Sequence, residues 1–389
     1  MKGKNIIHIS TTSTTTAMKL IILKNNLAEA LYAVERAVGI NTNLAILKNI
    51  LLKTENNKIL AITTNLELAI TATIPGKIIK PGEITVPFAI LSTIIRNVVT
   101  ERVILEEQDH NLLITTDNYE AKVQTQSAKD FPIIPTIQNT THFLSLPTEL
   151  LKTTLGNVIV ATQFSDIRPE ISGVLIRYTE GKLTLVATDS FRLAEQVLEG
   201  KQVVSGYDEV SAIIPLRTAE ELLRVMDLEN GEIRMVIDAN QILFQTASLS
   251  VISRLIDGTF PEYHSIIPKQ VRYEFSINRQ EFLSAIKLVS AFSGRTNDIS
   301  LTVGEGKRFL ELYSADSAFG ENRYRVPIKL KGDKFSIAFN WRYLLDGLKV
   351  YRGEEILVGV NAADRPAVLR NANDPSLTYV LMSITQELK

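Results

Sequence analysis

The chain has 389 residues, which is enough for about two or three domains. Its composition, with 45% hydrophobic and 22% charged residues, is that of ordinary globular proteins, and no apolar run approaches the roughly 20 residues that cross a membrane. The absence of cysteine excludes disulfides and thiolate chemistry and fits a reducing cytoplasm, while 42 Lys and Arg against 43 Asp and Glu argue against a conventional basic nucleic-acid-binding protein.

The first 17 residues lie outside the pattern that organises the rest of the chain. Their apolar run, Ile6 to Ile9, is too short for the core of a signal peptide, and a Thr-rich stretch follows it. Met18 begins the first predicted strand. We therefore expect residues 1–17 to be a disordered extension or the product of a mis-set start codon.

An apolar quartet with one fixed spacing occurs three times. The quartets are Ile22, Leu27, Leu31 and Val34; Leu146, Leu151, Leu155 and Val158; and Ile277, Phe282, Ile286 and Val289. The last three members fall at i, i+4 and i+7, which is one stripe of an α-helix, and the first lies in a short strand just before it. Polar residues near the helix starts, Asn25, Thr148 and Asn278, are candidate N-caps. Such self-similarity predicts three copies of one structural unit.

Each copy continues in the same way. An apolar strand ends in a turn-forming residue, Asn65, Asp189 or Asp316, and a second helix is expected at residues 87–98, 215–226 and 340–351. Proline pairs at 131–135 and 260–268 look like linkers. The sequence therefore predicts an α+β fold with three repeated domains, at residues 18–141, 142–269 and 270–389.

Few residues suggest catalysis. The 4 histidines have no metal-ligand spacing, so neither a metal nor a cofactor is expected. Residues 304–307 resemble a phosphate-binding loop, but the upstream glycine is missing and Arg308 replaces Ser or Thr, so a hairpin turn is favoured. Asp166 and Asp189 could form an acid–base pair, yet Asp189 occupies the repeated turn position, which favours a structural role. We do not expect an enzyme, and a hydrolase is the least favoured alternative.

The predicted helices carry cations that could face one surface. The ordinary interpretation of each is a solvated helix face, and a functional interpretation requires all of the helices to line one surface. The candidates for DNA contact on the helices are Lys24, Arg36, Arg96, Lys152, Arg217, Arg224, Arg279 and Lys287.

Three local strings, on this threefold repeat, resemble one protein family. They are VATDSFRLA at 186–194, SRLIDGTFPEY at 253–263 and YVLM at 379–382. Together they resemble the bacterial DNA polymerase III beta subunit, the sliding clamp, over residues 18–389. The resemblance implies a head-to-tail homodimeric ring with three clamp domains per chain, in which helices line a central hole and antiparallel sheets form the outside.

The resemblance also implies the function and the partners. The ring would encircle double-stranded DNA without reading its sequence and would tether the replicative polymerase alpha subunit. The clamp loader, and other repair and replication proteins with clamp-binding motifs, would bind to the same ring. The alternative, from a different class, is a repeat-built scaffold that binds peptides and does not encircle DNA.

Three sets of residues follow from the resemblance. Arg168 joins the candidates for DNA contact. The dimer interface would bring Ala121 and Val123 of one copy to Val289 and Phe292 of the other. A hydrophobic pocket for partner peptides would lie between the second and third domains, formed by Ile171, Thr188, Ser190, Phe191, Arg192, Leu193, Pro261, Ser265, Ile266, Asn340, Tyr343, Pro366, Val380, Leu381, Met382, Ser383 and Ile384.

The sequence departs from the family pattern at its C-terminal end. Family members usually place a proline directly after the position of Met382 and a basic residue two positions further on, whereas this chain has Ser383 and Thr385 there. Ser265 also stands where some members have a basic residue. These changes leave the preference for particular partner motifs open.

Overall fold

The computed structural model describes residues 17–40, 43–137, 140–304, 306–361 and 365–384, which form two compact units. The first unit contains the described residues up to 136 together with 247–251, and the second contains the others. Apart from residue 17, the predicted extension lies outside the described residues. Within these ranges, no helix has the length and apolar character needed to cross a membrane.

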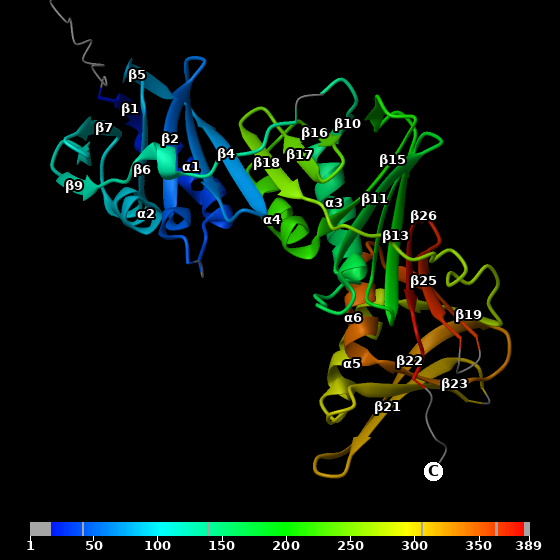
Figure 1. Cartoon of the computed structure of the whole chain (residues 1–389). Helices are drawn as coiled ribbons and strands as arrows, with labels where there is room; N and C mark the ends of the chain where they lie inside the picture. The colour runs from blue at the N-terminus through cyan, green and yellow to red at the C-terminus, as the bar shows by residue number, and fades with distance from the viewer. Residues whose placement is uncertain (1–16, 41–42, 138–139, 305, 362–364, 385–389) are drawn as a thin grey trace, which may run out of the picture. The chain divides into compact units, whose positions relative to one another are not determined.

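The first unit consists of two helices and two sets of paired strands (Figure 1). Its elements are β1 (Lys19–Leu23), α1 (Lys24–Val34), β2 (Asn49–Glu55), β3 (Lys58–Thr64), β4 (Leu68–Ile74), β5 (Gly76–Lys80), β6 (Glu83–Pro87), α2 (Phe88–Asn97), β7 (Arg102–Gln108), β8 (Asn111–Thr115) and β9 (Glu120–Gln124). One sheet has the strand order β5-β1-β7-β8-β9, and β4, β3, β2 and β6 are neighbours in a second. β9 is therefore an edge strand.

The second unit contains two further copies of this arrangement. The elements of one are β10 (Leu144–Pro147), α3 (Thr148–Ile159), β11 (Gly173–Thr179), β12 (Lys182–Thr188), β13 (Arg192–Glu199), β14 (Val204–Ser205), β15 (Glu209–Pro215), α4 (Leu216–Met226), β16 (Glu232–Ile237), β17 (Gln241–Gln245) and β18 (Leu249–Arg254), whose first residues belong to the first unit. Those of the other are β19 (Tyr273–Asn278), α5 (Arg279–Ser290), β20 (Asp298–Val303), β21 (Phe309–Asp316), β22 (Gly320–Lys331), β23 (Ser336–Asn340), α6 (Trp341–Val350), β24 (Glu355–Val360), β25 (Ala367–Asn371) and β26 (Asp374–Leu381).

The threefold repeat predicted from the quartets is confirmed. A strand runs directly into a helix at β1–α1, β10–α3 and β19–α5, and the second helices α2, α4 and α6 follow β6, β15 and β23. The helical members of each quartet are buried, as the stripe requires. The boundaries proposed for the three domains at 141 and 269 stay a prediction.

The first helix of each copy begins in the same way. The N–H of its first residue donates to the carbonyl of the residue just before the neighbouring strand: Lys24 to Glu101 (3.0 Å), Thr148 to Gly231 (2.8 Å) and Arg279 to Glu354 (2.7 Å). This main-chain bond satisfies one of the free N–H groups at each helix start.

Only one of the three predicted side-chain caps is present. The Asn278 side chain accepts a hydrogen bond from the Glu281 N–H (2.9 Å). The predictions for the other two were wrong. The N-cap position of α1 is Leu23, and Asn25 already lies inside the helix. The N-cap position of α3 is Pro147, and Thr148 is the first residue of the helix.

One long sheet joins the two copies in the second unit. Its strand order is β15-β11-β12-β13-β26-β25-β24-β19-β22-β21-β20-β23. Residues 192–196 of β13 pair antiparallel with residues 377–381 of β26, from Arg192 opposite Leu381 to Gln196 opposite Leu377. We call this pairing the seam. In Figure 1, α3 and α4 lie together, as do α5 and α6, on the same side of this sheet.

A buried apolar cluster lies under the seam. Leu193 and Val380, which are opposite each other in the seam, pack with Phe260, Tyr263 and Val368. Segments far apart in the sequence therefore share one core, so the two copies are joined by side-chain packing as well as by strand pairing.

Candidate functional site

The site begins at the repeated turn between two strands. The Asp189 carboxylate accepts hydrogen bonds from the N–H groups of Phe191 (2.9 Å) and Arg192 (3.0 Å). Asn65 and Asp316 use a side-chain oxygen in the same way in the other copies. The structural interpretation of Asp189 is therefore confirmed, and the turn fixes where β13 starts.

Arg192 is held between two carboxylates and a ring. Its Nε lies 2.9 Å from Asp189 Oδ2, and one terminal nitrogen lies 2.9 Å from Asp346 Oδ2. Its guanidinium carbon lies 4.4 Å from the centre of the Tyr343 ring. Burial alone would lower the pKa of Arg192, but Tyr379, Asp346 and Asp189 together raise it. Because only 9% of its side chain is exposed and these contacts hold it, Arg192 contributes a fixed positive charge to one side of the site.

An aromatic ledge, Phe191 and Tyr343, lies beside Arg192. The two rings are stacked, with centroids 6.4 Å apart, and Phe191 is 60% exposed. The buried Tyr379 hydroxyl of β26 donates to the Tyr343 carbonyl (2.8 Å), which ties this part of α6 to β26. An exposed, supported aromatic pair of this kind offers a flat apolar surface to a ligand.

The C-terminal segment of the described chain crosses the same place. The Met382 N–H donates to the Phe191 carbonyl (2.8 Å), and the Ile384 N–H donates to the Ala338 carbonyl (2.8 Å). The Asn340 side chain is occupied as the N-cap of α6, where it accepts from the Arg342 N–H (3.0 Å).

The predicted pocket residues differ in how they can act. Those on the surface are Ser190, Phe191, Ser265 and Ile266. Those partly covered are Arg192, Pro261, Asn340, Tyr343, Pro366, Met382, Ser383 and Ile384. Those buried are Ile171, Thr188, Leu193, Val380 and Leu381. The structure therefore brings the 188–193, 340–346 and 380–384 segments together, while the buried residues support the surface from below.

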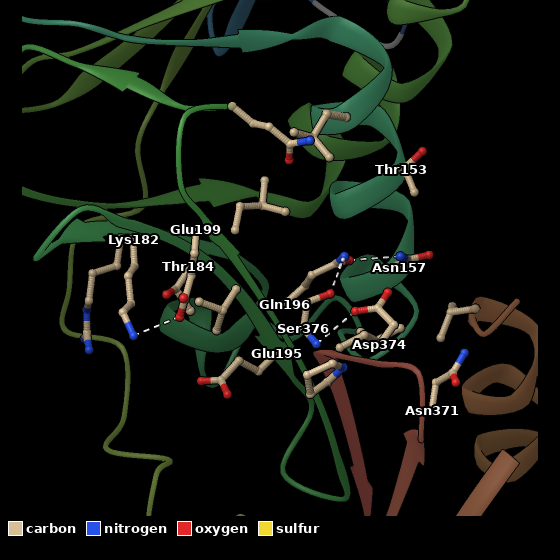
Figure 2. Close-up of a pocket in the computed structure, with 18 of the residues that line it drawn as sticks. Thr153, Asn157, Lys182, Thr184, Glu195, Gln196, Glu199, Asn371, Asp374 and Ser376 are labelled. Carbon is tan, nitrogen blue, oxygen red and sulfur yellow. Dashed lines mark hydrogen bonds and ion pairs between the residues drawn. The ribbon is translucent and has the colours of Figure 1, made fainter.

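A cavity that sequence reasoning missed lies at the other end of the seam. It has a volume of about 920 Å³ and is lined by α3, β12, β13 and the start of β26, together with Tyr263 and His264 (Figure 2). No residue predicted for the peptide pocket lines it.

The candidate DNA-contact residues fall into two groups. Several are engaged within the chain: Arg96 with Glu35, Lys152 with Glu149 and Asp227, Arg168 with Glu170 and Ser190, Arg224 with Glu221, and Arg279 with the carbonyls of Leu348 and Gly353. The hydrogen bonds of Lys152 to Asp227 and Glu149 raise its pKa.

The remaining candidates are freer. Lys24, Arg217 and Lys287 have no ion pair with any described residue, and Arg36 lies over the Tyr32 ring, 5.2 Å from its centre. Arg217 and Lys287 are also exposed, which makes them the most available cations on their helices.

The residues predicted for the dimer interface need one correction. Ala121 is half-buried on edge strand β9, and Val123 is buried against the adjacent strand β8. Val289 is 0% exposed because it belongs to the stripe of α5 that faces the core, so its side chain is not available to a second copy. Its neighbour Leu288 is 54% exposed, and Phe292 is half-buried.

The remaining chemical motif is structural. β20 and β21, on either side of residues 304–307, pair antiparallel, and the Lys307 N–H donates to the Gly304 carbonyl (3.2 Å), so the hairpin interpretation is confirmed. Glu305 lies outside the described residues. Among the residues that are described, no group of three or more His, Cys, Asp or Glu side chains could hold a metal ion.

Comparisons with known families cover nearly the whole chain. Residues 18–135, 145–262 and 264–385 match, in order, the N-terminal, central and C-terminal domains of the DNA polymerase III beta subunit. The three matched segments correspond to the three structural copies.

Individual relatives agree with the family match. The beta sliding clamp of Bacillus subtilis is 28% identical over 379 residues, covering 94% of this chain and 99% of that protein. That of Synechococcus elongatus is 27% identical over 373 residues, with the same coverage.

Solved structures have the same fold. The DNA polymerase sliding clamp of Bacillus subtilis has a TM-score of 0.90 at 27% identity, covering 96% of this chain and 100% of the other. A sliding clamp from Bartonella birtlesii, bound to griselimycin, has a TM-score of 0.89 at 28% identity, covering 95% and 100%. The chain therefore belongs to the DNA polymerase III beta subunit family, the beta sliding clamps.

Proposed function

We propose that two copies of this chain close into a ring around duplex DNA and tether the replicative polymerase alpha subunit to it. The ring acts by enclosure and without catalysis, so that dissociation requires a protein interface to open. A tethered polymerase rebinds at a high effective concentration. The observation that carries the proposal is the threefold repeat, matched over all three clamp domains. Because bacterial DNA lies in the cytoplasm, we propose that the protein acts in the cytoplasm.

The open strand edges support a head-to-tail dimer. β9 is the last strand of its sheet, and within the part of the chain that the structure describes, residues 320–326 of β22 pair with β21 alone. These edges correspond to the two strands of the seam. β22 follows the Asp316 turn, just as β13 follows the Asp189 turn. β9 is followed by Gln126, which forms a β-bridge to Thr85 of β6, just as β26 is followed by Ile384, which forms a β-bridge to Ala338 of β23. Unpaired edges of this kind invite a partner strand.

Applying the register of the seam to these edges gives specific opposing residues. Glu120 of β9 would lie opposite the partner subunit's Arg323, and Lys122 would lie opposite the partner subunit's Glu321. Both pairs have opposite charge, which favours this register over a shift by one residue. The exposed Leu288 of α5 and the half-buried Phe292, which follows that helix, would complete the interface in place of Val289.

We assign docking of partner peptides to the surface formed by the aromatic ledge, Arg192 and the 380–384 segment. Its apolar area is small and its walls are fixed by the seam, so a short linear motif should bind at roughly micromolar strength. The same surface would serve the polymerase, the clamp loader and other replication and repair proteins in turn.

The contacts with DNA should be numerous and weak. Exposed cations on the helices, with Arg217 and Lys287 foremost, attract phosphates without reading bases. Because the net charge of the chain is −1, tight static binding is not expected, and a duplex inside the ring can slide. Screening over about 8–10 Å still lets these cations act across a water layer.

Retention on circular DNA tests the proposal. With clamp loader and ATP, the protein should remain on a nicked circle during gel filtration and should be lost when the circle is linearised. Equal retention on both forms, or a protein that stays monomeric at every concentration, would favour the peptide-binding scaffold that does not encircle DNA.

A further inference from the structure

Two large apolar side chains outside the docking surface are exposed at matching places in different copies of the repeat. Phe319, in the turn before β22 of the third copy, is 69% exposed, and Ile90, on α2 of the first copy, is 48% exposed. The residues at the corresponding places of the docking surface are Phe191 and Tyr343, which stack on each other. The third copy and the first copy therefore each carry one half of such a pair.

The strand register identifies the counterpart of Phe319. In the second copy, the Asp189 N–H donates to the Arg192 carbonyl (3.3 Å) across the turn, and in the third copy Asp316 is paired with Gly320. Gly320 therefore corresponds to Arg192. Phe319 directly precedes Gly320, as the phenylalanine of the aromatic ledge directly precedes Arg192, and the extra residue of the longer turn lies between Asp316 and Phe319.

The helix that carries Ile90 begins at the same place as α6. Thr85 of β6 and Ala338 of β23 form the β-bridges to the segments that follow β9 and β26, and each lies three residues before its helix. Ile90 is the third residue of α2, and Tyr343 is the third residue of α6. The exposed position of Ile90 is therefore that of the helix residue on which the aromatic ledge is built.

The backbone of β9 is oriented to bring these two positions together in a dimer. In the seam, the Met382 N–H donates to the carbonyl of the ledge phenylalanine (2.8 Å). Gln124 corresponds to Met382, because each lies two residues before the residue that forms the bridge. The Thr125 N–H donates to a carbonyl beside β8 (3.2 Å), so Gln124, one residue earlier, directs its N–H to the open side of β9. The Phe319 carbonyl of a second copy is the acceptor that the register gives to this N–H.

We propose that Phe319 of one copy packs against the partner subunit's Ile90 at each junction of the ring, in an apolar contact that neither copy completes alone. The contact rests on the proposed ring and on the register of the seam. Its strands pair charge with charge, so this contact supplies apolar area beside them, where the turn meets the helix. Closing the ring removes both side chains from water, which favours the closed state.

The occupant of this site is the second copy, because the site lacks the charge of the docking surface. There, Arg192 is held by Asp346, the sixth residue of α6. The corresponding residues of the junction are Gly320 and Thr93, the sixth residue of α2, and neither carries a charge. The junction thus keeps the apolar pair and loses the charged side of the surface that would bind a linear motif.

Alanine substitutions test the contact through dimerisation of the full chain. F319A and I90A should each raise the dissociation constant of the dimer about tenfold, and the double variant should be about as weak as either one, because the two side chains contact each other. F309A removes another exposed phenylalanine, at the opposite end of β21, and should leave the constant unchanged. Sedimentation velocity measures the constants, and urea unfolding should show the same stability for all of these monomers.

Cross-linking tests the proximity of the two residues. The chain has no cysteine, so introduced thiols are the only ones present. I90C combined with F319C should give a covalent dimer with a short bismaleimide. I90C alone, and I90C combined with F309C, should stay monomeric on a denaturing gel.

Two results would overturn the proposal. They are an unchanged dissociation constant in F319A, and cross-linking of I90C with F319C that is no greater than that of I90C with F309C. If F319A leaves dimerisation unchanged but lowers the affinity for a clamp-motif peptide, the site is a second docking surface instead. If F319A has no effect while charge reversal at Glu120 weakens the dimer, the ring stands and only this contact fails, whereas a wild-type chain that is monomeric at every concentration would overturn both.

Discussion

The seam and the open edges of β9 and β22 are two versions of one junction. In the seam, both strands belong to one chain, and the buried side chains of Leu193, Val380 and Tyr379 make the pairing part of a core. At the open edges, the corresponding strands carry charged residues, such as Glu120, Lys122, Glu321 and Arg323. The comparison teaches that the strand pairing within one chain is built by apolar packing, whereas the strand pairing proposed between two copies, which a loader would open, is built with charge.

The largest predicted effect lies in the closed junction. Tyr379 is fully buried, fills the space beside Gly347 and donates to the Tyr343 carbonyl. Y379A should lower the free energy of unfolding by about 3–5 kcal/mol, because it leaves a cavity and removes a buried hydrogen bond. Urea unfolding measures this. The same substitution at Tyr119, which lies just before β9 and is 39% exposed, should cost the monomer less than about 1 kcal/mol. Equal losses would mean that the two junctions are not built differently.

A C-terminal truncation is a poor test of partner docking, because the C-terminal segment is also part of the seam. Deleting the chain from Val380 onward removes Val380 and Leu381, which are buried members of the seam. Such a truncation would disturb the fold of the second unit as well as the docking of partners. Substitutions on the exposed ledge are therefore the better probe of docking.

A charge reversal should break the open junction. E120R places two cations opposite each other in the predicted register, and should weaken dimerisation about 10- to 100-fold. Sedimentation velocity measures the dissociation constant. Combining E120R with R323E should restore most of the affinity, whereas R325E, two residues along the same strand, should not rescue it. If the double variant stays as weak as E120R, then the register carried over from the seam is wrong.

The sequence predicted the repeat and the turns because both depend on local physics. The quartet spacing identifies one helix stripe, and Asp189 caps its own turn with a side chain three residues from Arg192. The same periodicity already assigned Val289 to the core, so its placement at the dimer interface contradicted the pattern, and the structure agrees with the pattern.

The second cavity could not be predicted from the sequence, because it depends on where two distant strands cease to pair. The pairing of β13 with β26 ends at Gln196 opposite Leu377, and Ser376, the residue before Leu377, instead donates its N–H to Asp374. Likewise, no local signal indicates that Arg192 would be held by Asp346 from α6.

A smaller effect is expected at the docking surface. F191A removes the exposed ring of the aromatic ledge. It should lower the affinity for a labelled polymerase peptide that carries the clamp-binding motif about tenfold, and it should leave the free energy of unfolding unchanged. Fluorescence anisotropy and urea unfolding together separate the two effects. In contrast, R192A leaves the Asp189 and Asp346 carboxylates without their cation and should lower both affinity and stability. Unchanged affinity in F191A would mean that the ledge is not part of the docking surface.

The smallest effects belong to the cations that would face DNA. Lys287 is exposed and has no ion pair with a described residue, whereas Lys152 is held by Asp227 and Glu149, which raise its pKa. If Lys287 approaches a phosphate, then K287Q should reduce the slope of log affinity against log salt concentration by about 0.9 per protomer. K152Q should change that slope less, because its charge is already compensated by two carboxylates. Titration of loaded rings at several salt concentrations measures both slopes, and a larger effect of K152Q would mean that its ion pairs open when DNA binds.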